Sequence, residues 1–417
     1  MHYLFIYPSP GVLGGIETLL ARTSRWLIRD GHQVTLLLEK GGDWTEILPK
    51  EAKCIVLGNR FRELYYYFHA RRLWKSLKLS PPDVIKSFDL PSSWMACQLG
   101  DQIGNKCKVL AGIYNPLIFK WYYSSKSLPR WDDNLLYLRN YLKHIPASSR
   151  VFCGVDQIEE LEEIHHEKGS LWPIPIDTSG FEPAARKPKW GKIVSVGRLS
   201  PMKEYNLYMI DVVSALRKRG HDVTWWVYGT GKYEAAMREQ IKKQGLEEVV
   251  KLEGHVAYER FWKVLEEAYV FVGMGTAVLE AALFKVPNVN ALAYDRAGLT
   301  HGPVYRFPPG SIGPGNTSPP NLLVVDEIER ILRLDSVGYQ TEADLVYRHA
   351  REHEMEVSME HFQQLVRNAG SIPRGITRYL ANYPLWFIRQ FMKPLAGTRK
   401  ETHPSGPLLA YEPKIQP

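Results

Sequence analysis

The chain has 417 residues, of which 45% are hydrophobic and 24% are charged, values typical of a globular protein that folds. The length exceeds what one ordinary hydrophobic core organises, so we expect two domains of about 150–200 residues each. The net charge of +8 favours an anionic partner, such as a phosphorylated ligand, a nucleic acid or an acidic membrane surface, and charge alone does not choose among them.

The cysteines and the N-terminus bear on the compartment. The four cysteines are scattered and form no C-x-x-C pair, which argues against a zinc site and a redox dithiol (Cys54, Cys97, Cys107 and Cys153). We expect buried, reduced thiols in a cytosolic protein. The apolar stretch at 3–7 is short and breaks at Pro8, unlike a signal peptide, and no stretch approaches 18 apolar residues. We therefore expect a cytoplasmic protein without a membrane-spanning helix.

The first half of the chain alternates short apolar runs with longer amphipathic ones. The short runs predict strands at 3–7, 34–38, 54–57, 83–87 and 109–113. The longer ones predict helices at 18–29 and 61–78. The buried stripe of the first helix is expected to contain Leu19, Leu20, Thr23, Trp26 and Leu27. This β-α-β alternation predicts a parallel sheet with helices on both faces.

The same pattern restarts after the polar segment 182–191. It predicts strands at 192–196, 223–227, 249–253 and 269–272, and helices at 204–219, 232–244, 258–267 and 276–285. We therefore predict an α/β protein with two Rossmann-like, doubly wound parallel-sheet domains that face a central cleft. The expected limits are 1–182 for the first domain and 188–368 for the second, followed by a helical segment at 369–395 and a loose tail at 396–417. A return of segment 369–395 to the first domain is one alternative for its place.

The segment VGRLSPMKEYNL (196–207) places two cations after a buried strand. The apolar run 193–196 ends at Gly197, and Arg198 and Lys203 follow before the next helix. An arginine can fork onto two phosphate oxygens, and a lysine adds a compact point charge. The N-terminal dipole of a helix disfavours cations unless an anion offsets them. We therefore expect an anionic ligand here, and the alternative is a pair of solvated surface side chains.

The segment GVLGGIE (11–17) joins the first strand to the first helix. Gly14 and Gly15 leave backbone N–H groups open at a helix N-terminus, which suits an anion such as a phosphate. The alternative is a tight turn whose backbone angles require glycine.

The segment GMGTAVLEAALFKVP (273–287) follows the last predicted strand. Gly273 and Gly275 bracket a turn, and Thr276 is expected to cap the helix that begins there. Glu280 then lies about one turn into an apolar helix. A carboxylate in such a segment is either paired or accepts hydrogen bonds from a ligand, and in nucleotide-binding α/β folds that ligand is commonly a ribose. The alternative is that Glu280 caps a neighbouring loop.

Taken in chain order, these segments and three others resemble the motifs of the retaining glycosyltransferases of family 4, which have the GT-B fold. The resemblance covers about residues 3–365. The further segments are PDVIKSFDL (82–90), IPIDTSGFEP (174–183), and YGTGKYE (228–234) followed by LEGHV (252–256). The segment YGTGKYE lacks the Ser or Thr that follows the lysine of a Walker loop, so it is not taken as a P-loop.

The resemblance implies transfer of a sugar from a nucleotide-sugar, with retention of the anomeric configuration. By this analogy Arg198 and Lys203 hold the diphosphate leaving group and stabilise its developing charge, and Glu280 binds the ribose. The glycine segments approach the phosphates or the sugar. The donor site implied in full contains Gly14, Gly15, Arg198, Lys203, Gly229, Gly273, Gly275, Thr276 and Glu280. No metal or other cofactor is expected, since no cluster of metal ligands is visible.

The chain also departs from the family pattern. The family's last motif usually has a glutamate eight positions before the second one, and here that position is Val272. Tyr114 stands where a histidine is often found. Asp89, Tyr114 and Asn115 are our candidates for the acceptor side, with Asp89 and Tyr114 grouped with Arg198 and Lys203 as catalytic candidates. No general base is assigned.

Three segments interleave aromatic and basic residues, at 61–78, 118–131 and 378–395. Such surfaces suit contact with an anionic membrane at the inner face, although core helices are the alternative. A membrane contact would favour a lipid-linked or growing glycan acceptor, and nucleic acid is not expected as a partner. Two other functional hypotheses stay open: a non-catalytic GT-B partner that binds nucleotide or glycan, and a nucleotide-sugar epimerase.

Overall fold

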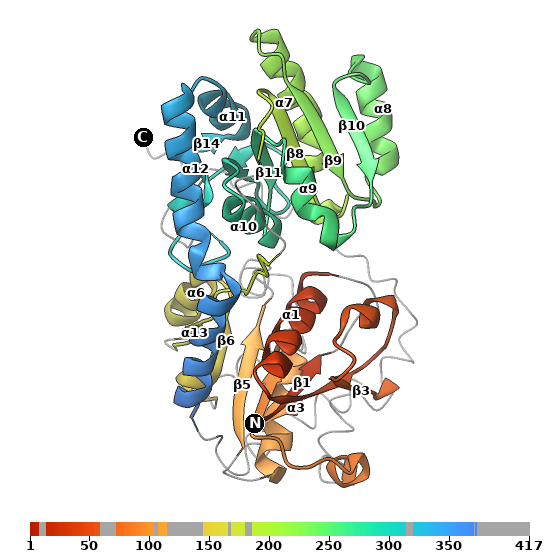
Figure 1. Ribbon diagram of the computed structural model, residues 1–417, viewed down its shortest axis with the longest axis vertical. Coiled ribbons are helices and arrows are strands. Elements are labelled where there is room, and N and C mark those ends of the chain that lie inside the picture. The colour runs from red at the N-terminus through yellow and green to blue at the C-terminus, as the bar shows by residue number, and fades with distance from the viewer. Residues whose placement is uncertain are drawn as a thin grey trace.

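The computed structural model describes residues 1–7, 14–58, 72–103, 107–114, 145–165, 168–179, 186–313, 320–370 and 372. Two parallel sheets organise the chain, one in each half, and Figure 1 shows them one above the other with helices packed around each. This arrangement confirms the prediction of an α/β protein with two doubly wound parallel sheets.

Seven strands form the first sheet, in the order β3-β2-β1-β4-β5-β6-β7, and all neighbouring pairs are parallel. The strands are β1 (His2–Tyr7), β2 (Gln33–Leu38), β3 (Lys53–Val56), β4 (Val84–Ser87), β5 (Lys108–Ile113), β6 (Arg150–Phe152) and β7 (Ser170–Leu171). The helices of this half are α1 (Gly15–Arg29), α3 (Leu90–Ile103) and α6 (Val155–His165). Each of the five strands predicted for this half lies within two residues of its expected place.

Both faces of the first sheet are buried. Along β1, Leu4 and Ile6 pack into one hydrophobic cluster, whereas Tyr3, Phe5 and Tyr7 pack into another on the opposite face. The near-continuous apolar runs that predict these strands follow from this double burial, because a parallel sheet covered by helices needs apolar side chains in both directions.

Five strands form the second sheet, in the order β10-β9-β8-β11-β12, again all parallel. The strands are β8 (Lys192–Val196), β9 (Thr224–Tyr228), β10 (Val250–Gly254), β11 (Val270–Gly273) and β12 (Asn288–Asn290). The helices around this sheet are α7 (Tyr205–Lys218), α8 (Glu234–Gln244), α9 (Phe261–Leu265), α10 (Thr276–Leu283), α11 (Val324–Leu332) and α12 (Ser336–Ala350). A short antiparallel pair, β13 (Leu299–Thr300) and β14 (Leu322–Leu323), lies beyond the sheet.

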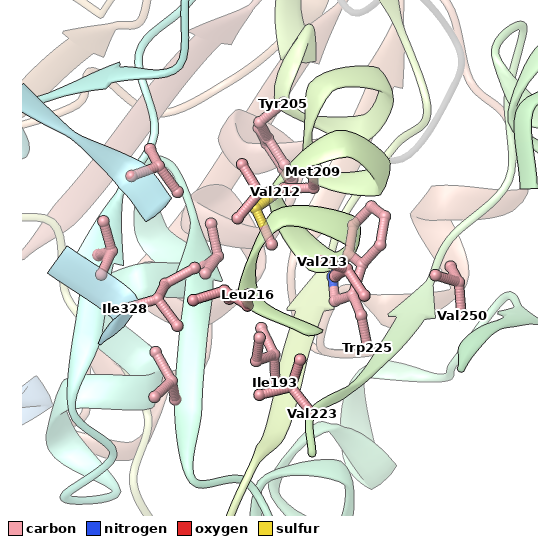
Figure 2. Packing of buried hydrophobic residues seen from close by; sticks show 14 of the residues in the cluster. Ile193, Tyr205, Met209, Val212, Val213, Leu216, Val223, Trp225, Val250 and Ile328 are labelled. Carbon is pink, nitrogen blue, oxygen red and sulfur yellow. The ribbon is translucent and has the colours of Figure 1, made fainter. Parts of the chain in front are cut away.

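Helix α7 lies on one face of this sheet, in line with the amphipathic pattern of its sequence. Figure 2 shows its apolar side chains (Tyr205, Met209, Val212, Val213 and Leu216) packed beside Ile193 of β8 and Trp225 of β9. Trp225 is fully buried, and its Nε1–H donates to Ser195 Oγ at 2.9 Å.

The last described helix, α13 (Met355–Asn368), belongs to the first half in space. Met359, Phe362 and Val366 pack into the same cluster as Tyr3 and Trp172, and Figure 1 shows α12 and α13 running along one side of both halves. The chain thus returns to the first sheet at 355–368, inside the range 188–368 that we assigned to the second domain. The physical reason is the apolar stripe of α13, which completes the core beneath β1. Of the predicted segment 369–395, only residues 369, 370 and 372 are described, and the tail at 396–417 lies outside the described residues.

The chain crosses between the two halves near residues 174–176 and again near residues 353–354, and these two segments run side by side. The Ile176 N–H donates to the His353 carbonyl at 2.7 Å, and His353 Nδ1 lies 3.1 Å from the Ile174 carbonyl oxygen. His353 is fully buried, and burial lowers its pKa to about 4, so the ring is neutral at pH 7. The two crossings are therefore held together by hydrogen bonds between residues 174–176 and His353, which ends a 3-10 turn.

Two local predictions are corrected by the structure. Helix α10 begins at Thr276 and its N-cap is Gly275, with no side-chain capping bond, so Thr276 is not the cap. The positive φ of Gly275 (70°) explains this, because the chain turns into the helix at a position that favours glycine. The helix expected at 258–267 is a 3-10 turn, Tyr258–Arg260, followed by the short α9. The helix expected at 61–78 is described only from residue 72.

Candidate active site

The predicted site residues follow four strands that meet at the switch points of the two sheets. In the first sheet β1 lies between β2 and β4, and in the second β8 lies between β9 and β11, so the strand order reverses at β1/β4 and at β8/β11. Gly14, Asp89, Arg198 and Gly275 come after the carboxyl ends of these four strands. Ligands of doubly wound folds bind at such switch points, which makes the junction of the two halves the candidate site.

Arg198 and Lys203 lie side by side in the segment between β8 and α7. Lys203 ends a 3-10 turn, and its Nζ lies over Gly197, so closely that a Cβ at Gly197 would approach it to 2.2 Å. Burial and the Arg198 guanidinium lower the pKa of Lys203 to about 8. Among the described residues, neither cation has a carboxylate within 4.0 Å. Two adjacent cations that have no carboxylate within ion-pair distance in the described part of the chain are suited to bind an anion that carries at least two charges.

Arg198 reaches the first half of the chain at the start of α1. Its Nη2 atom lies 4.0 Å from the position that a Cβ at Gly14 would occupy. Gly14 is the N-cap of α1 and Gly15 is its first residue, so the open N–H groups and positive dipole end of α1 face the same place as the Arg198 guanidinium. The φ of Gly14 is −152°, an extended conformation, so the absence of a side chain matters here for space and not for a left-handed turn.

Tyr7 and Glu17 complete this part of the site and were not identified from the sequence. The Tyr7 hydroxyl donates to Glu17 Oε1 at 2.9 Å, and both side chains are buried. The pKa of Tyr7 is raised by burial and by the carboxylates of Glu17 and Asp89, and Arg198 opposes this rise. The carboxylates of Glu17 and Asp89 and the guanidinium of Arg198 therefore all act on the Tyr7 hydroxyl. An acidic residue in the first turn of α1 is the sequence signal that could have indicated Glu17.

Gly229 fixes the position of the cationic segment. Its φ is 158°, and a Cβ there would lie 1.9 Å from the Gly197 carbonyl oxygen. The Gly197 N–H donates to the Tyr228 carbonyl at 2.9 Å, and the Leu199 N–H donates to the Thr230 carbonyl at 3.0 Å. Gly229 therefore lets the segment after β9 pack directly against the backbone that carries Arg198.

Glu280 is buried in α10 and pairs with Arg22 of α1, across the junction. The Tyr258 hydroxyl donates to the same carboxylate oxygen, Oε1, at 3.1 Å. Arg22 also donates to the Pro175 carbonyl at 3.1 Å, and its guanidinium lies 4.6 Å from the centre of the Tyr258 ring. Burial lowers the pKa of Arg22, but the Glu280 carboxylate raises it by more, so the pKa lies above its ordinary value. Arg22 was not identified from the sequence, since no local pattern links residues 258 positions apart.

The remaining donor-side residues lie around the start of α10. Gly273 ends β11 against the Phe271 ring, and a Cβ at Gly275 would meet open space. Val272, the position of the missing glutamate, is fully buried in β11. Its side chain is part of the hydrophobic core, so this position presents no group to the site.

The two acceptor-side candidates have different surroundings. The Asp89 carboxylate accepts hydrogen bonds from the Ser92 backbone N–H at 2.8 Å and from the Ser92 hydroxyl, so it caps α3 while its charge still reaches Tyr7. Tyr114 is buried in an aromatic cluster, stacked on Phe88 with ring centres 5.6 Å apart. The structure therefore brings Asp89 to the site and places Tyr114 in the core behind it. Asn115 lies outside the described residues.

No group of three or more His, Cys, Asp or Glu side chains in the described ranges could hold a metal ion. None of the helices in these ranges combines the length and hydropathy that a bilayer crossing would need.

Comparisons with known proteins identify the family of the chain. The model of the family "Glycosyltransferase Family 4" matches residues 13–179, and that of "Glycosyl transferases group 1" matches residues 180–298. Together they span residues 13–298, more than half of the 417 residues. No curated protein sequence matches the chain.

Solved structures with the same fold are distant in sequence. A glycosyltransferase from Rickettsia africae is 14% identical with a TM-score of 0.63, over 88% of this chain and 98% of that one. HepE from Anabaena, in complex with UDP and glucose, is 16% identical with a TM-score of 0.60, over 88% and 99%. The lipopolysaccharide outer core galactosyltransferase WaaB is 14% identical with a TM-score of 0.59, over 88% and 99%. The chain has the two-domain, Rossmann-like GT-B fold, and it belongs to the group 1, family 4 glycosyltransferases.

Proposed function

We propose that this glycosyltransferase moves a sugar from a nucleoside-diphosphate-sugar to a glycan or lipid-linked acceptor, with retention of configuration and without a metal ion. The observation that carries the proposal is the pair Arg198 and Lys203, which has no carboxylate partner among the described residues and faces the N-terminus of α1. Two fixed cations and a helix N-terminus form a site for a diphosphate. The UDP and glucose bound to HepE support this assignment.

The chemistry follows from where charge develops. As the bond between the sugar and the diphosphate breaks, negative charge grows on the leaving oxygen and positive charge grows on the sugar. Arg198, Lys203 and the N–H groups at the start of α1 would stabilise the leaving group without any protein reorganisation. Because these groups supply the positive charge, a divalent cation is not required. Glu280 would accept hydrogen bonds from the ribose hydroxyls, with Gly273, Gly275 and Thr276 lining the approach.

The acceptor side is proposed from the position of Asp89. Asp89 lies at the end of β4 and its charge reaches Tyr7, so an acceptor hydroxyl near Asp89 would lie beside the sugar. The acceptor class follows from the basic and aromatic segments of the sequence, which suit a lipid-linked glycan at the inner face of a membrane. The printed name of WaaB, a lipopolysaccharide galactosyltransferase, supports a glycan acceptor.

The proposal is tested by measuring sugar transfer in the presence of EDTA. Release of the nucleoside diphosphate should depend on an acceptor, and nuclear magnetic resonance of the product should show the anomeric configuration of the donor. Arg198→Ala should slow turnover roughly 100-fold or more, the effect of removing a group that stabilises transition-state charge. Arg238→Ala is the matched control, since Arg238 is an exposed residue of α8 that pairs with Glu234.

One observation favours a non-catalytic nucleotide- or glycan-binding partner as a second candidate. Val272 is buried where the family usually has a glutamate. Nucleotide binding that persists with no acceptor-dependent release would favour this candidate, and inverted products would exclude retention.

A further inference from the structure

Arg22 is the residue of the junction that neither the sequence analysis nor the proposed chemistry uses. It lies in α1, is only 4% exposed, and reaches from the first half of the chain to Glu280 in the second. An unpaired charge at such a position is costly, so the contact favours the arrangement in which the two halves meet.

The two oxygens of Glu280 are used unequally. Arg22 and the Tyr258 hydroxyl both donate to Oε1, whereas Oε2 receives no hydrogen bond from the described residues. A carboxylate held by one oxygen has a fixed orientation, and in the described part of the chain its second oxygen is left as an acceptor. A ligand hydroxyl can therefore bind Oε2 without displacing Arg22.

Arg22 is itself held from several sides. Its guanidinium lies over the Tyr258 ring at 4.6 Å, and it donates to the Pro175 carbonyl, which belongs to the crossing between the halves. The nearby Asp177 carboxylate, whose pKa is lowered, adds negative charge on the same side. The guanidinium of Arg22 in α1 therefore contacts both the crossing at Pro175 and Glu280 of α10.

Helix α1 also connects this contact to the phosphate end of the site. Gly15 and Arg22 are seven residues apart, which is two turns, so they lie on the same face about 10 Å apart along the axis. The rigid helix therefore places its N-terminus at Arg198 and Arg22 at Glu280 at the same time.

We propose that Arg22 is a positioning residue for donor recognition. It orients Glu280 so that the carboxylate binds the ribose hydroxyls only while the two halves are in contact. This inference rests on the proposed function, because it takes the ribose of a nucleotide-sugar as the partner of Glu280. Arg22 touches no reacting atom and acts through the carboxylate.

The test compares nucleotides that differ only in the ribose hydroxyls. Titration calorimetry would use UDP, GDP and ADP, each beside its 2′,3′-dideoxy counterpart. In the wild type the nucleotide that binds should bind at least about tenfold more tightly than its dideoxy form, since hydrogen bonds to a charged group are lost. In Arg22→Met this ratio should fall to about one, while the affinity for the dideoxy form should change little.

Matched variants separate positioning from general structure. Arg25→Met removes an exposed arginine of the same helix and should keep the wild-type ratio. Arg22→Lys retains a charged donor and should restore part of the ratio. If thermal unfolding shows that Arg22→Met does not fold, Arg22→Gln, which retains a donor for the Pro175 carbonyl, replaces it with the same expected result.

The outcomes distinguish this inference from the proposed function. A wild-type ratio in a folded Arg22→Met or Arg22→Gln would overturn the inference and leave the proposed function intact. Equal binding of both forms by the wild type would also overturn it, while the diphosphate assignment to Arg198 would stand. Failure of the folded wild type to bind any of the nucleotides would contradict the proposed function itself.

Discussion

At the scale of one residue, Lys203 is central to the proposed anion site. Its pKa is lowered to about 8, first by burial and then by the neighbouring Arg198 guanidinium. Keeping Lys203 protonated therefore costs free energy, and a bound diphosphate would remove that cost. This is the arrangement expected of a ligand site, because a cation that served stability alone would have a carboxylate partner.

The lowered pKa predicts how nucleotide affinity depends on pH. Lys203 is mostly protonated at pH 7 and loses its proton as pH rises through about 8, whereas arginine does not titrate in this range. Because the anion binds the charged form, the dissociation constant of the nucleoside diphosphate should rise roughly tenfold per pH unit above pH 8, until the higher pKa of the complex is reached. Calorimetry from pH 6.5 to 9.5 measures this rise. Lys203→Arg should abolish it, and an unchanged pH dependence in that variant would show that another group titrates.

Lys86 is a buried lysine of a different kind. It is fully buried, its Nζ lies 4.9–5.3 Å from the ring centres of Phe88, Tyr114 and Trp172, and it donates to the Ser87 carbonyl at 3.3 Å. No carboxylate of the described residues pairs with it. Burial lowers its pKa well below the ordinary value, and the nearby Cys153 only partly opposes this.

This environment predicts that Lys86 destabilises the fold. Its folded-state pKa is below its unfolded one, so the unfolded chain binds more protons and stability rises as pH rises toward about 10.5. Lys86→Met should therefore raise the free energy of unfolding by about 1–3 kcal/mol at pH 7, and the gain should shrink as pH rises. Urea unfolding at pH 7 and pH 9.5 tests this, and a loss of stability at both values would show that the aromatic contacts of the amine outweigh its burial.

At the scale of elements, the site depends on close packing between the segments that follow β8 and β9. Gly229 is essential to this packing, because a Cβ would lie 1.9 Å from the Gly197 carbonyl oxygen. Gly245, the C-cap of α8, also has a positive φ, but a Cβ there would meet open space.

These two glycines form a matched pair of substitutions. Gly245→Ala should cost about 1–2 kcal/mol of stability through its left-handed backbone and should leave nucleotide binding unchanged. Gly229→Ala should cost more and should also weaken nucleoside diphosphate binding roughly tenfold or more, because it displaces the segment that carries Arg198. Thermal unfolding and calorimetry on both variants provide the measurement. Equal nucleotide affinities in the two variants would contradict the positioning role of Gly229.

The elements that could be predicted from the sequence are those with a strong local pattern. Strands β1, β2 and β8 are mostly apolar runs, as is typical of parallel sheets buried on both faces. Helix α3 was not predicted, although Asp89 followed by Ser92 is an N-terminal capping signal. Helix α13 has apolar residues at helical spacing, yet its position on the first half depends on tertiary packing that no local pattern encodes.

At the scale of the whole molecule, the candidate site lies where the two halves meet. The sequence predicted a site at Arg198, Lys203 and the α1 glycines, because strand-to-helix loops of doubly wound folds gather at one edge. It could not identify the pair of Arg22 with Glu280 or the closeness of Arg198 to Gly14, since these depend on how the domains face each other. The burial of Tyr114 was missed for a similar reason: its place in the core is set by Phe88 and Trp172, which are distant in sequence.

The central claim is that Arg198 and Lys203 bind the diphosphate of a nucleotide at the junction of the two halves. The most direct measurement is titration calorimetry of UDP, GDP, ADP and dTDP into the wild type and Arg198→Ala, with EDTA present. We predict that one nucleotide binds the wild type selectively and that Arg198→Ala weakens this binding roughly tenfold or more while the protein stays folded. Equal affinity in the two proteins, or no binding of any of the four nucleotides to the folded wild type, would contradict the claim.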